Sequence, residues 1–202
     1  MIDKQYGDKE RLRGGRPWSF DRDEALEIAM TLFWQHGYEG VSIGDLTKAI
    51  GIAPPSLYAA FVSKEKLYQS VLDLYEAKAG AYKIEQVRAA SGVPEAVAIL
   101  LDHAAGFVFA HGRGCMISVG MVTFSGAHAS IARDLAERRE KLRERIATAI
   151  AQWVSRDEAE RMARMVLSTM QGLSIQALDG ATREELQMVV DEVVAGLRAR
   201  FA

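Results

Sequence analysis

Apolar residues recur at spacings of three and four along most of the chain, which is the pattern of helices that bury one face. The first stripe of this kind contains Leu26, Ala29, Met30 and Phe33. A helix is predicted to begin at Asp21, where the spacing Asp-x-x-Glu satisfies free backbone N–H groups. It is predicted to end at Gly37, because glycine commonly follows the last helical residue.

Two short helices joined by a tight turn are predicted next. The first begins at Ser42, covers 43–50 and stops at Gly51, where glycine allows a positive φ. The second begins at Pro54-Pro55, because proline is tolerated in a first turn, and runs to Phe61. A small apolar core would fix the two axes at a steep angle, as in a helix-turn-helix. The members of this core are Ile43, Leu46, Ile50, Ile52, Leu57 and Phe61.

The rest of the chain also shows helical periodicity. Ser63 caps a fourth helix, whose apolar stripe contains Leu67, Val71, Leu74 and Ala79. Further helices are predicted at 94–110, 115–124, 128–153, 156–178 and 183–200. No segment has the sustained period-two alternation typical of strands. The predicted fold class is therefore all-α.

Composition narrows the class of protein. The chain has 202 residues, a net charge of −2 and 49% hydrophobic residues, which are ordinary values for a globular protein. A single cysteine, Cys115, rules out an internal disulfide and fits a reducing cytoplasm. The N-terminus lacks the apolar core of a signal peptide. The apolar run at 96–101 stops at Asp102, short of a membrane span. We therefore expect a cytoplasmic protein that does not contact membranes.

The start of the second short helix is expected to be exposed, which would let it enter the major groove of DNA. Pro54 and Pro55 offer apolar contact to thymine methyl groups, and Ser56 offers a hydroxyl to a base or a phosphate. Tyr58 can reach a phosphate through its hydroxyl. These residue types favour contact with double-stranded DNA.

Three residues outside that helix are further candidates for DNA contact. Ser42 and Lys64 lie at helix N-termini, where free N–H groups and the helix dipole attract phosphates. Arg16 belongs to a polar stretch, 1–18, that is expected to be a flexible arm reaching the minor groove or the backbone. Total charge gives no support, because residues 1–68 contain nine Lys/Arg and ten Asp/Glu. DNA binding must therefore rest on where the basic groups lie.

The ordered residues around this motif resemble the DNA-binding signature of TetR-family transcriptional regulators, over about residues 20–75. The resemblance is carried by Leu32-Phe33, Gly37-Tyr38, Ser42-Ile43, Asp45-Leu46, Gly51-Ile52-Ala53, Ser56-Leu57-Tyr58, Phe61 and Ser63-Lys64-Glu65. It implies DNA-facing positions at Ser42, Pro54, Pro55, Ser56, Tyr58 and Lys64. It also implies an arm at 1–18, a three-helix DNA-binding domain at 19–66 and a helical effector-binding and dimerisation domain at 67–202. The function implied is a sequence-specific, ligand-responsive repressor that binds a palindromic operator as a homodimer.

The last two helices are the predicted dimer interface, as two helices from each subunit would form a four-helix bundle. Their stripes are Met162, Met165, Thr169, Gly172 and Leu173 on one helix, and Leu186, Val189, Val190, Val193 and Leu197 on the other. Part of each stripe is expected to pack within the subunit. The resemblance also implies a cavity for a small-molecule effector of unknown identity. Candidate lining residues, each more often plain core, are Tyr75, His103, Phe107, Met121, Phe124, Trp153 and Met170.

Other interpretations have less support. His111 and Cys115 suggest a metal or redox site, but the two glycines between them indicate a loop, and a metal site needs three or four converging ligands. We expect no metal and no cofactor. An enzyme would need a nucleophile elbow, a phosphate-binding loop or a dinucleotide fingerprint, and these motifs are missing from the sequence. A helix-turn-helix that binds protein instead of DNA is supported only by the near-neutral charge of 1–68. The charged run at 137–145 is interpreted as a solvated helix face.

Overall fold

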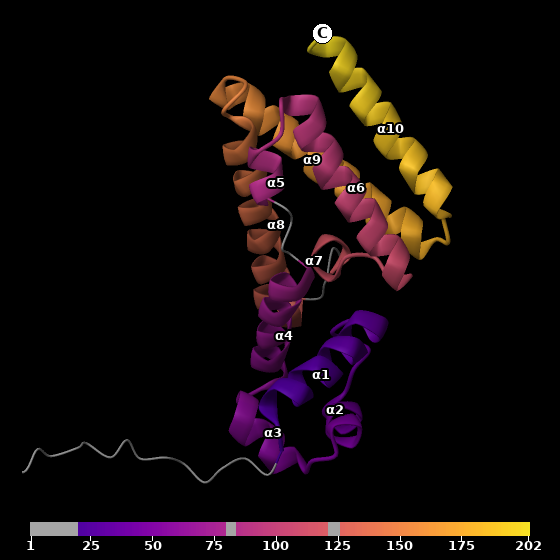
Figure 1. Ribbon diagram of the computed structural model, residues 1–202. Coiled ribbons are helices and arrows are strands. Elements are labelled where there is room, and N and C mark those ends of the chain that lie inside the picture. Colours follow the sequence, from indigo (N-terminus) through magenta and orange to yellow (C-terminus); the bar gives the residue numbers. More distant parts are fainter. Residues whose placement is uncertain (1–19, 80–83, 121–125) are drawn as a thin grey trace, which may run out of the picture.

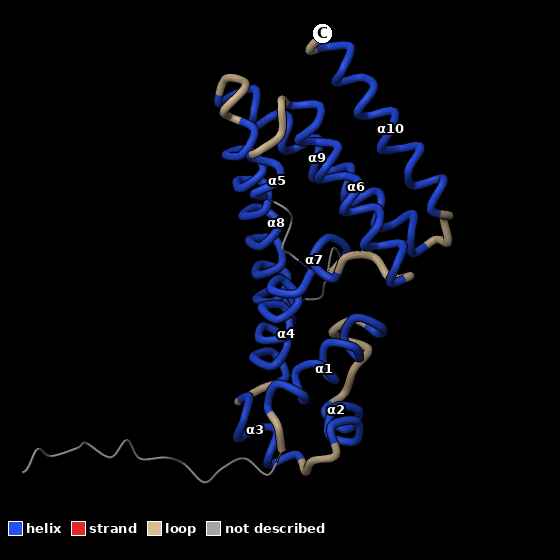
Figure 2. Tube along the Cα trace, in the orientation of Figure 1, coloured by secondary structure: helices blue, strands red, loops and turns tan. Residues whose placement is uncertain are grey.

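The computed structural model describes residues 20–79, 84–120 and 126–202, and these residues form helices joined by turns, with no strand among them (Figures 1 and 2). The predicted all-α class is confirmed. The helices are, in chain order, α1 (Arg22–His36), α2 (Ile43–Ile50), α3 (Pro54–Phe61), α4 (Lys64–Ala79), α5 (Ile84–Arg88), α6 (Val93–His111), α7 (Met116–Val119), the 3-10 helix η1 (Gly126–His128), α8 (Ala129–Ile150), α9 (Arg156–Leu178) and α10 (Arg183–Arg200).

The helices form a small group and a larger one, and α4 joins them. Figure 1 shows α1, α2 and α3 together at one end, while α6, α8, α9 and α10 build the body of the molecule. Leu67, Val71 and Leu72 of α4 are completely buried, and α4 packs against α1 in the first group and α7 in the second. One helix therefore contributes to the apolar cores of both groups.

Arg138 of α8 fixes the outer side of α4 by ion pairing. Its guanidinium lies 2.6 Å from the carboxylate of Asp73, contacts Glu76, and lies 3.1 Å from Asp134 on its own helix. The Arg138 side chain is only 10% exposed, so these partners replace water that burial has removed. Burial, together with the charge of Asp134, also raises the pKa of the neighbouring Tyr68 to about 12.

Two predicted helix ends differ from the observed ones by three residues or more. The helix expected at 115–124 ends at Val119, where the backbone of Gly120 is extended, and residues 121–124 of the prediction lie outside the described residues. The helix expected to reach residue 153 ends at Ile150, after which residues 151–153 form a turn. The short helix α5 was not predicted. Apolar periodicity carries little information over a segment of five residues.

Two further expectations need correction. Helix α6 is long and apolar enough, by length and composition, to cross a membrane, although the sequence reading found no such run. In the fold it packs against α5, α9 and α10. The charged run at 137–145 is not wholly solvated: Arg143 is 8% exposed, and Arg138 and Arg139 are partly buried. Helix α8 contacts elements on more than one side. The aliphatic parts of these three arginine side chains therefore pack along apolar surface, with their guanidinium groups at the edge of it.

We expect Arg138→Met to lower the free energy of unfolding by about 2 kcal/mol, because it leaves three carboxylates without their common partner. Urea denaturation followed by circular dichroism measures this. The matched control is Arg145→Met on the same helix, where the arginine is exposed. Equal losses in the two variants would contradict a specific role for Arg138.

Candidate nucleic-acid interface

Helix α2 begins with a capping box at Ser42. The Ser42 hydroxyl oxygen accepts a hydrogen bond from the backbone N–H of Asp45 at 3.1 Å. In return, the Asp45 carboxylate accepts from the backbone N–H of Ser42 at 2.8 Å and from its hydroxyl at 2.6 Å. These hydrogen bonds from Ser42 lower the pKa of Asp45. The sequence reading placed Ser42 at a helix N-terminus, and the structure confirms that position.

The turn between α2 and α3 depends on Gly51. Its φ of 78° and ψ of 31° lie in the left-handed region, and its N–H donates to the carbonyl of Thr47 at 2.9 Å. Leu46, Leu57 and Phe61 are buried beneath the turn. Ile43, Ile50 and Ile52 were also expected in this core but are only partly buried there.

Helix α3 presents side chains instead of backbone donors at its N-terminus. Pro54 and Pro55 have no N–H, the N–H of Ser56 donates to the carbonyl of Ala53 at 2.9 Å, and no side chain caps the helix. The usual anion site of a helix N-terminus is therefore missing. Pro54, Pro55 and Tyr58 are exposed, with Tyr58 at 46%, and Ser56 is partly buried. These four predicted residues form one short face of α3.

Lys64 lies at the start of α4 and packs on Tyr38. Its ammonium nitrogen is 4.1 Å from the centre of the Tyr38 ring, which is a cation–π contact. Burial lowers the pKa of Lys64, and the charges of Glu39 and Asp45 oppose that shift. A phosphate contact by Lys64 stays a prediction. Arg16 and the arm at 1–18 lie outside the described residues.

The joint between α3 and α4 is a strained turn centred on Val62. This residue has φ 66° and ψ −49°, and the N–H of Ser63 donates to the carbonyl of Phe61 at 2.7 Å. These values correspond to the rare form of the γ-turn, which is unfavourable for a β-branched side chain. Since Val62 is 76% exposed, little packing compensates for the strain. The angle between α3 and α4 is therefore held at an energetic cost.

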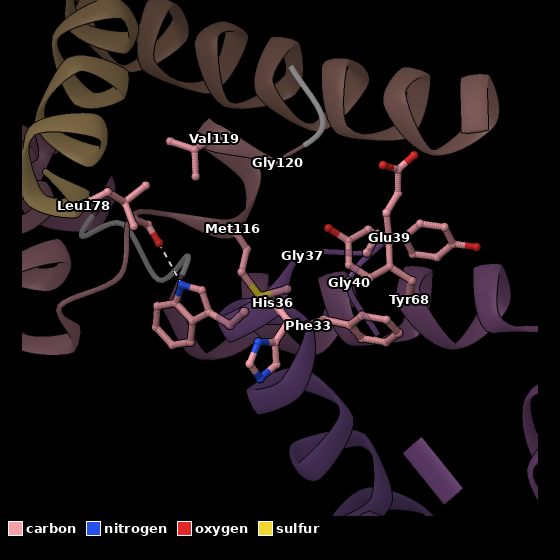
Figure 3. Close-up of a pocket in the computed structure, with 13 residues that line it drawn as sticks. Phe33, His36, Gly37, Glu39, Gly40, Tyr68, Met116, Val119, Gly120 and Leu178 are labelled. Atoms are coloured by element: carbon pink, nitrogen blue, oxygen red, sulfur yellow. Dashed lines mark hydrogen bonds between the residues drawn. The ribbon is translucent and has the colours of Figure 1, made fainter. Parts of the chain in front are cut away.

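Trp34 links the helix-turn-helix group to the body of the protein, a role that the sequence reading missed. Its indole N–H donates to the carbonyl of Gly114 at 2.7 Å, shown as the dashed line in Figure 3. Its ring stacks on Phe107, with centroids 5.8 Å apart, and also contacts Tyr75 and His111. The only signal in the sequence was an aromatic residue beside the apolar stripe of the first predicted helix.

Four of the predicted effector residues come together next to Trp34. Tyr75, His103, Phe107 and Met170 line one cavity, together with Cys115, Ser118 and Ser174. The free volume is about 20 Å³, which is room for about one water molecule. An effector that enters here must displace side chains.

The other effector candidates do not join this cavity. Trp153 lies in the turn after α8 and is absent from the cavity lining. Met121 and Phe124 lie outside the described residues. His111 is exposed and Cys115 is buried at the start of α7. Within 20–79, 84–120 and 126–202, no group of three or more His, Cys, Asp or Glu side chains is placed to hold a metal ion.

Comparison with known proteins identifies the family. Residues 25–71 match the sequence model of bacterial regulatory proteins of the tetR family. The HTH-type transcriptional repressor ComR of Escherichia coli K12 is 34% identical over 87% of this chain and 88% of its own length. The repressor BdcR of the same organism is 33% identical over 85% and 86%, respectively. The chain belongs to the TetR family.

Solved structures of TetR-family regulators have the same fold. A cysteine mutant of the regulator CifR, complexed with 26-base-pair double-strand operator DNA, matches with a TM-score of 0.82 and 33% identity. The match covers 89% of this chain and 98% of that one. A TetR regulator from Legionella pneumophila matches with a TM-score of 0.72 at 19% identity, over 92% and 99% of the two chains, which supports the fold alone.

We expect Val62→Gly to raise the free energy of unfolding by about 1 kcal/mol, because glycine adopts the γ-turn without strain. Urea denaturation is the measurement. Ala59→Gly is the matched control: Ala59 is exposed inside α3, and glycine there should lower stability by about 1 kcal/mol. If both variants were destabilised alike, Val62 would not be strained.

Proposed function

We propose that this TetR-family protein is a ligand-responsive repressor that binds a palindromic operator as a homodimer. Like its relatives, the protein is a DNA-binding transcriptional regulator. It is not an enzyme. The observation that carries the repressor proposal is the face of α3 on which Pro54, Pro55 and Tyr58 are exposed and Ser56 is partly buried. Support comes from the repressor names of the Escherichia coli relatives and from the complex of CifR with operator DNA. The proposal includes action in the cytoplasm, which fits a DNA-binding protein with a single cysteine.

The face of α3 suits recognition through the major groove. Direct readout needs side chains that present hydroxyl groups and apolar surface to base edges, and all four residues fit this description. Because the first turn offers no free N–H, phosphate contacts must come from other places. Ser42 at the start of α2, Lys64 at the start of α4 and Arg16 in the arm are the residues that we assign to them.

A homodimer would form through α9 and α10. Much of each predicted stripe packs within the subunit, since Met162, Leu173, Leu186, Val190 and Leu197 are buried. Apolar side chains remain exposed on the other faces of these helices, with Met165 at 38%, Ile175 at 52% and Met188 at 59%. Val189 and Val193, which are partly buried, extend this surface. Exposed apolar residues that cluster on two neighbouring helices are typical of a subunit interface.

The effector would bind in the cavity lined by Tyr75, His103, Phe107 and Met170. The free space is small, so the effector would select a conformation in which these side chains have moved apart. Phe107 stacks on Trp34 of α1, and Tyr75 contacts the same indole. Cavity opening would therefore move a side chain of the helix-turn-helix group directly. The contacts of Trp34 would thus differ between the effector-bound and the effector-free state. Such a difference is what coupling between effector binding and operator binding requires.

We expect Tyr58→Ala to weaken operator binding about tenfold or more, as it removes a side chain from the centre of the α3 face. The operator is first selected from fragmented genomic DNA of the source organism, and affinity is then measured by fluorescence anisotropy. Phe109→Ala is a close control, since Phe109 is 45% exposed against 46% for Tyr58 and lies on α6. Selection that enriches no inverted repeat, or equal affinity of the two variants, would overturn the proposal.

We expect the double variant Ile175→Glu with Met188→Glu to be monomeric, because four added charges would be buried in each dimer. Sedimentation equilibrium gives the mass of the unmodified protein and the variant. The control is Phe109→Glu, which adds a charge outside the proposed interface. Persistence of the dimer in the double variant, or a monomeric unmodified protein, would refute the assignment of α9 and α10.

A further inference from the structure

The segment that contains the α3 face has no charged or amide side chain. Residues 49–63 run from the position after Lys48 to the position before Lys64, and they contain no Asp, Glu, Lys, Arg, His, Asn or Gln. Helix α3 lies within this segment, and Figure 1 shows it at the end of the molecule opposite the C-terminus. The side chains that α3 can bring to the edges of DNA bases are therefore apolar or carry a hydroxyl group.

This composition excludes the strongest forms of base recognition by α3. In the major groove, Arg or Lys pairs with guanine, Asn or Gln pairs with adenine, and Asp or Glu accepts a hydrogen bond from cytosine. Lysines border the segment instead: Lys48 is exposed in the last turn of α2, and Lys64 is the first residue of α4. Contacts from lysine to phosphates would position α3 on the duplex without reading its sequence.

The first turn of α3 does not supply the missing donors from its backbone. Pro54 and Pro55 have no N–H, and the N–H of Ser56 donates to the carbonyl of Ala53 at 2.9 Å. The side-chain donors of the helix are the hydroxyl groups of Ser56, which is partly buried, and Tyr58, which is exposed. Few hydrogen bonds to base edges are thus available to α3.

The exposed side of α3 is apolar and shallow. Leu57 and Phe61 are buried in the core, and with about 3.6 residues per turn Pro55 and Ala59 lie on the opposite side of the helix, one turn apart. Both are exposed, and their short side chains allow the helix backbone to come close to the bases. The feature that an apolar side chain reads in the major groove is the 5-methyl group of thymine.

We propose that α3 reads the operator half-site through the 5-methyl groups of thymines, with Pro55 and Ala59 as the residues that contact them. The inference rests on the proposed repressor function and names the chemical feature that the operator must present. Acceptors on guanine contribute little to selection in this mode. Any base that presents a methyl group at the same place in the groove replaces thymine, and 5-methylcytosine is such a base.

Deoxyuridine tests the proposal, because it differs from thymidine only in lacking the 5-methyl group. The operator is selected from genomic DNA of the source organism, and each thymine of the inverted repeat is replaced by uracil in symmetry-related pairs. At least one pair should weaken binding about tenfold, from a loss of about three- to fourfold in each half-site, as measured by fluorescence anisotropy. Replacement of guanine by 7-deazaguanine, which lacks the N7 acceptor, should leave affinity unchanged.

5-Methylcytosine separates the methyl group from the base pair that carries it. At a position that is sensitive to uracil, exchange of T·A for C·G should weaken binding. The same exchange made with 5-methylcytosine should restore most of the lost affinity, because the methyl group returns to its place while the hydrogen-bonding groups of the pair remain changed.

Pro55→Ala connects the methyl group to α3. The variant should bind the thymine operator more weakly, and replacement by uracil should then have little further effect, because the contact is already lost. Pro94→Ala is the matched control, since Pro94 is the second residue of α6 as Pro55 is the second residue of α3. The control should change neither the affinity nor the effect of uracil, and circular dichroism checks that both variants are folded.

Three outcomes would overturn the inference alone. They are that no thymine is sensitive to uracil, that 5-methylcytosine fails to restore binding, or that uracil weakens binding equally in Pro55→Ala and the unmodified protein. Each outcome is observed with a protein that binds its operator, so the repressor proposal would stand. Selection that enriches no inverted repeat would overturn both.

Discussion

The burial of α4 between two helix groups is the constraint on which the rest of the structure depends. Leu67, Val71 and Leu72 place this helix in the common core, and the guanidinium of Arg138 holds its outer side through Asp73 and Glu76. Because α4 follows α3 after a single γ-turn, α3 has no flexible linker of its own. Any change in how α4 packs must therefore reach α3 and the exposed face that we propose contacts DNA.

A second connection between the groups runs through Trp34. Its hydrogen bond to Gly114 and its stacking on Phe107 join α1 to the segment around α6 and α7, on a different side from Arg138. Two connections to one small helical group restrict rotation more than either one does alone. The cavity lined by Phe107 lies beside this indole, so any rearrangement of its side chains would alter the contact between the two groups.

The sequence predicted the helices well where local chemistry decides them. Caps at Asp21 and Ser42, and left-handed Gly51, lie where polar side chains and glycine have strong intrinsic preferences. It failed where packing between distant segments decides the outcome. Arg138 is buried because α4 lies beside α8, and nothing in the run at 137–145 records that neighbour. The close approach of Gly114 to the carbonyl of Ser174 could not be predicted either, since these residues are far apart in the sequence and meet only in the folded chain.

Where the two helix groups meet, positions that the backbone constrains lie beside positions that it does not. Gly40, Gly114 and Gly120 leave no room for a Cβ, since a carbonyl oxygen lies 2.2 to 2.7 Å from the place it would occupy. Glu39, by contrast, is largely solvent-exposed, and the fold loses little when its side chain changes. The surface chemistry at this junction can therefore vary by single substitutions while the backbone beneath it stays the same.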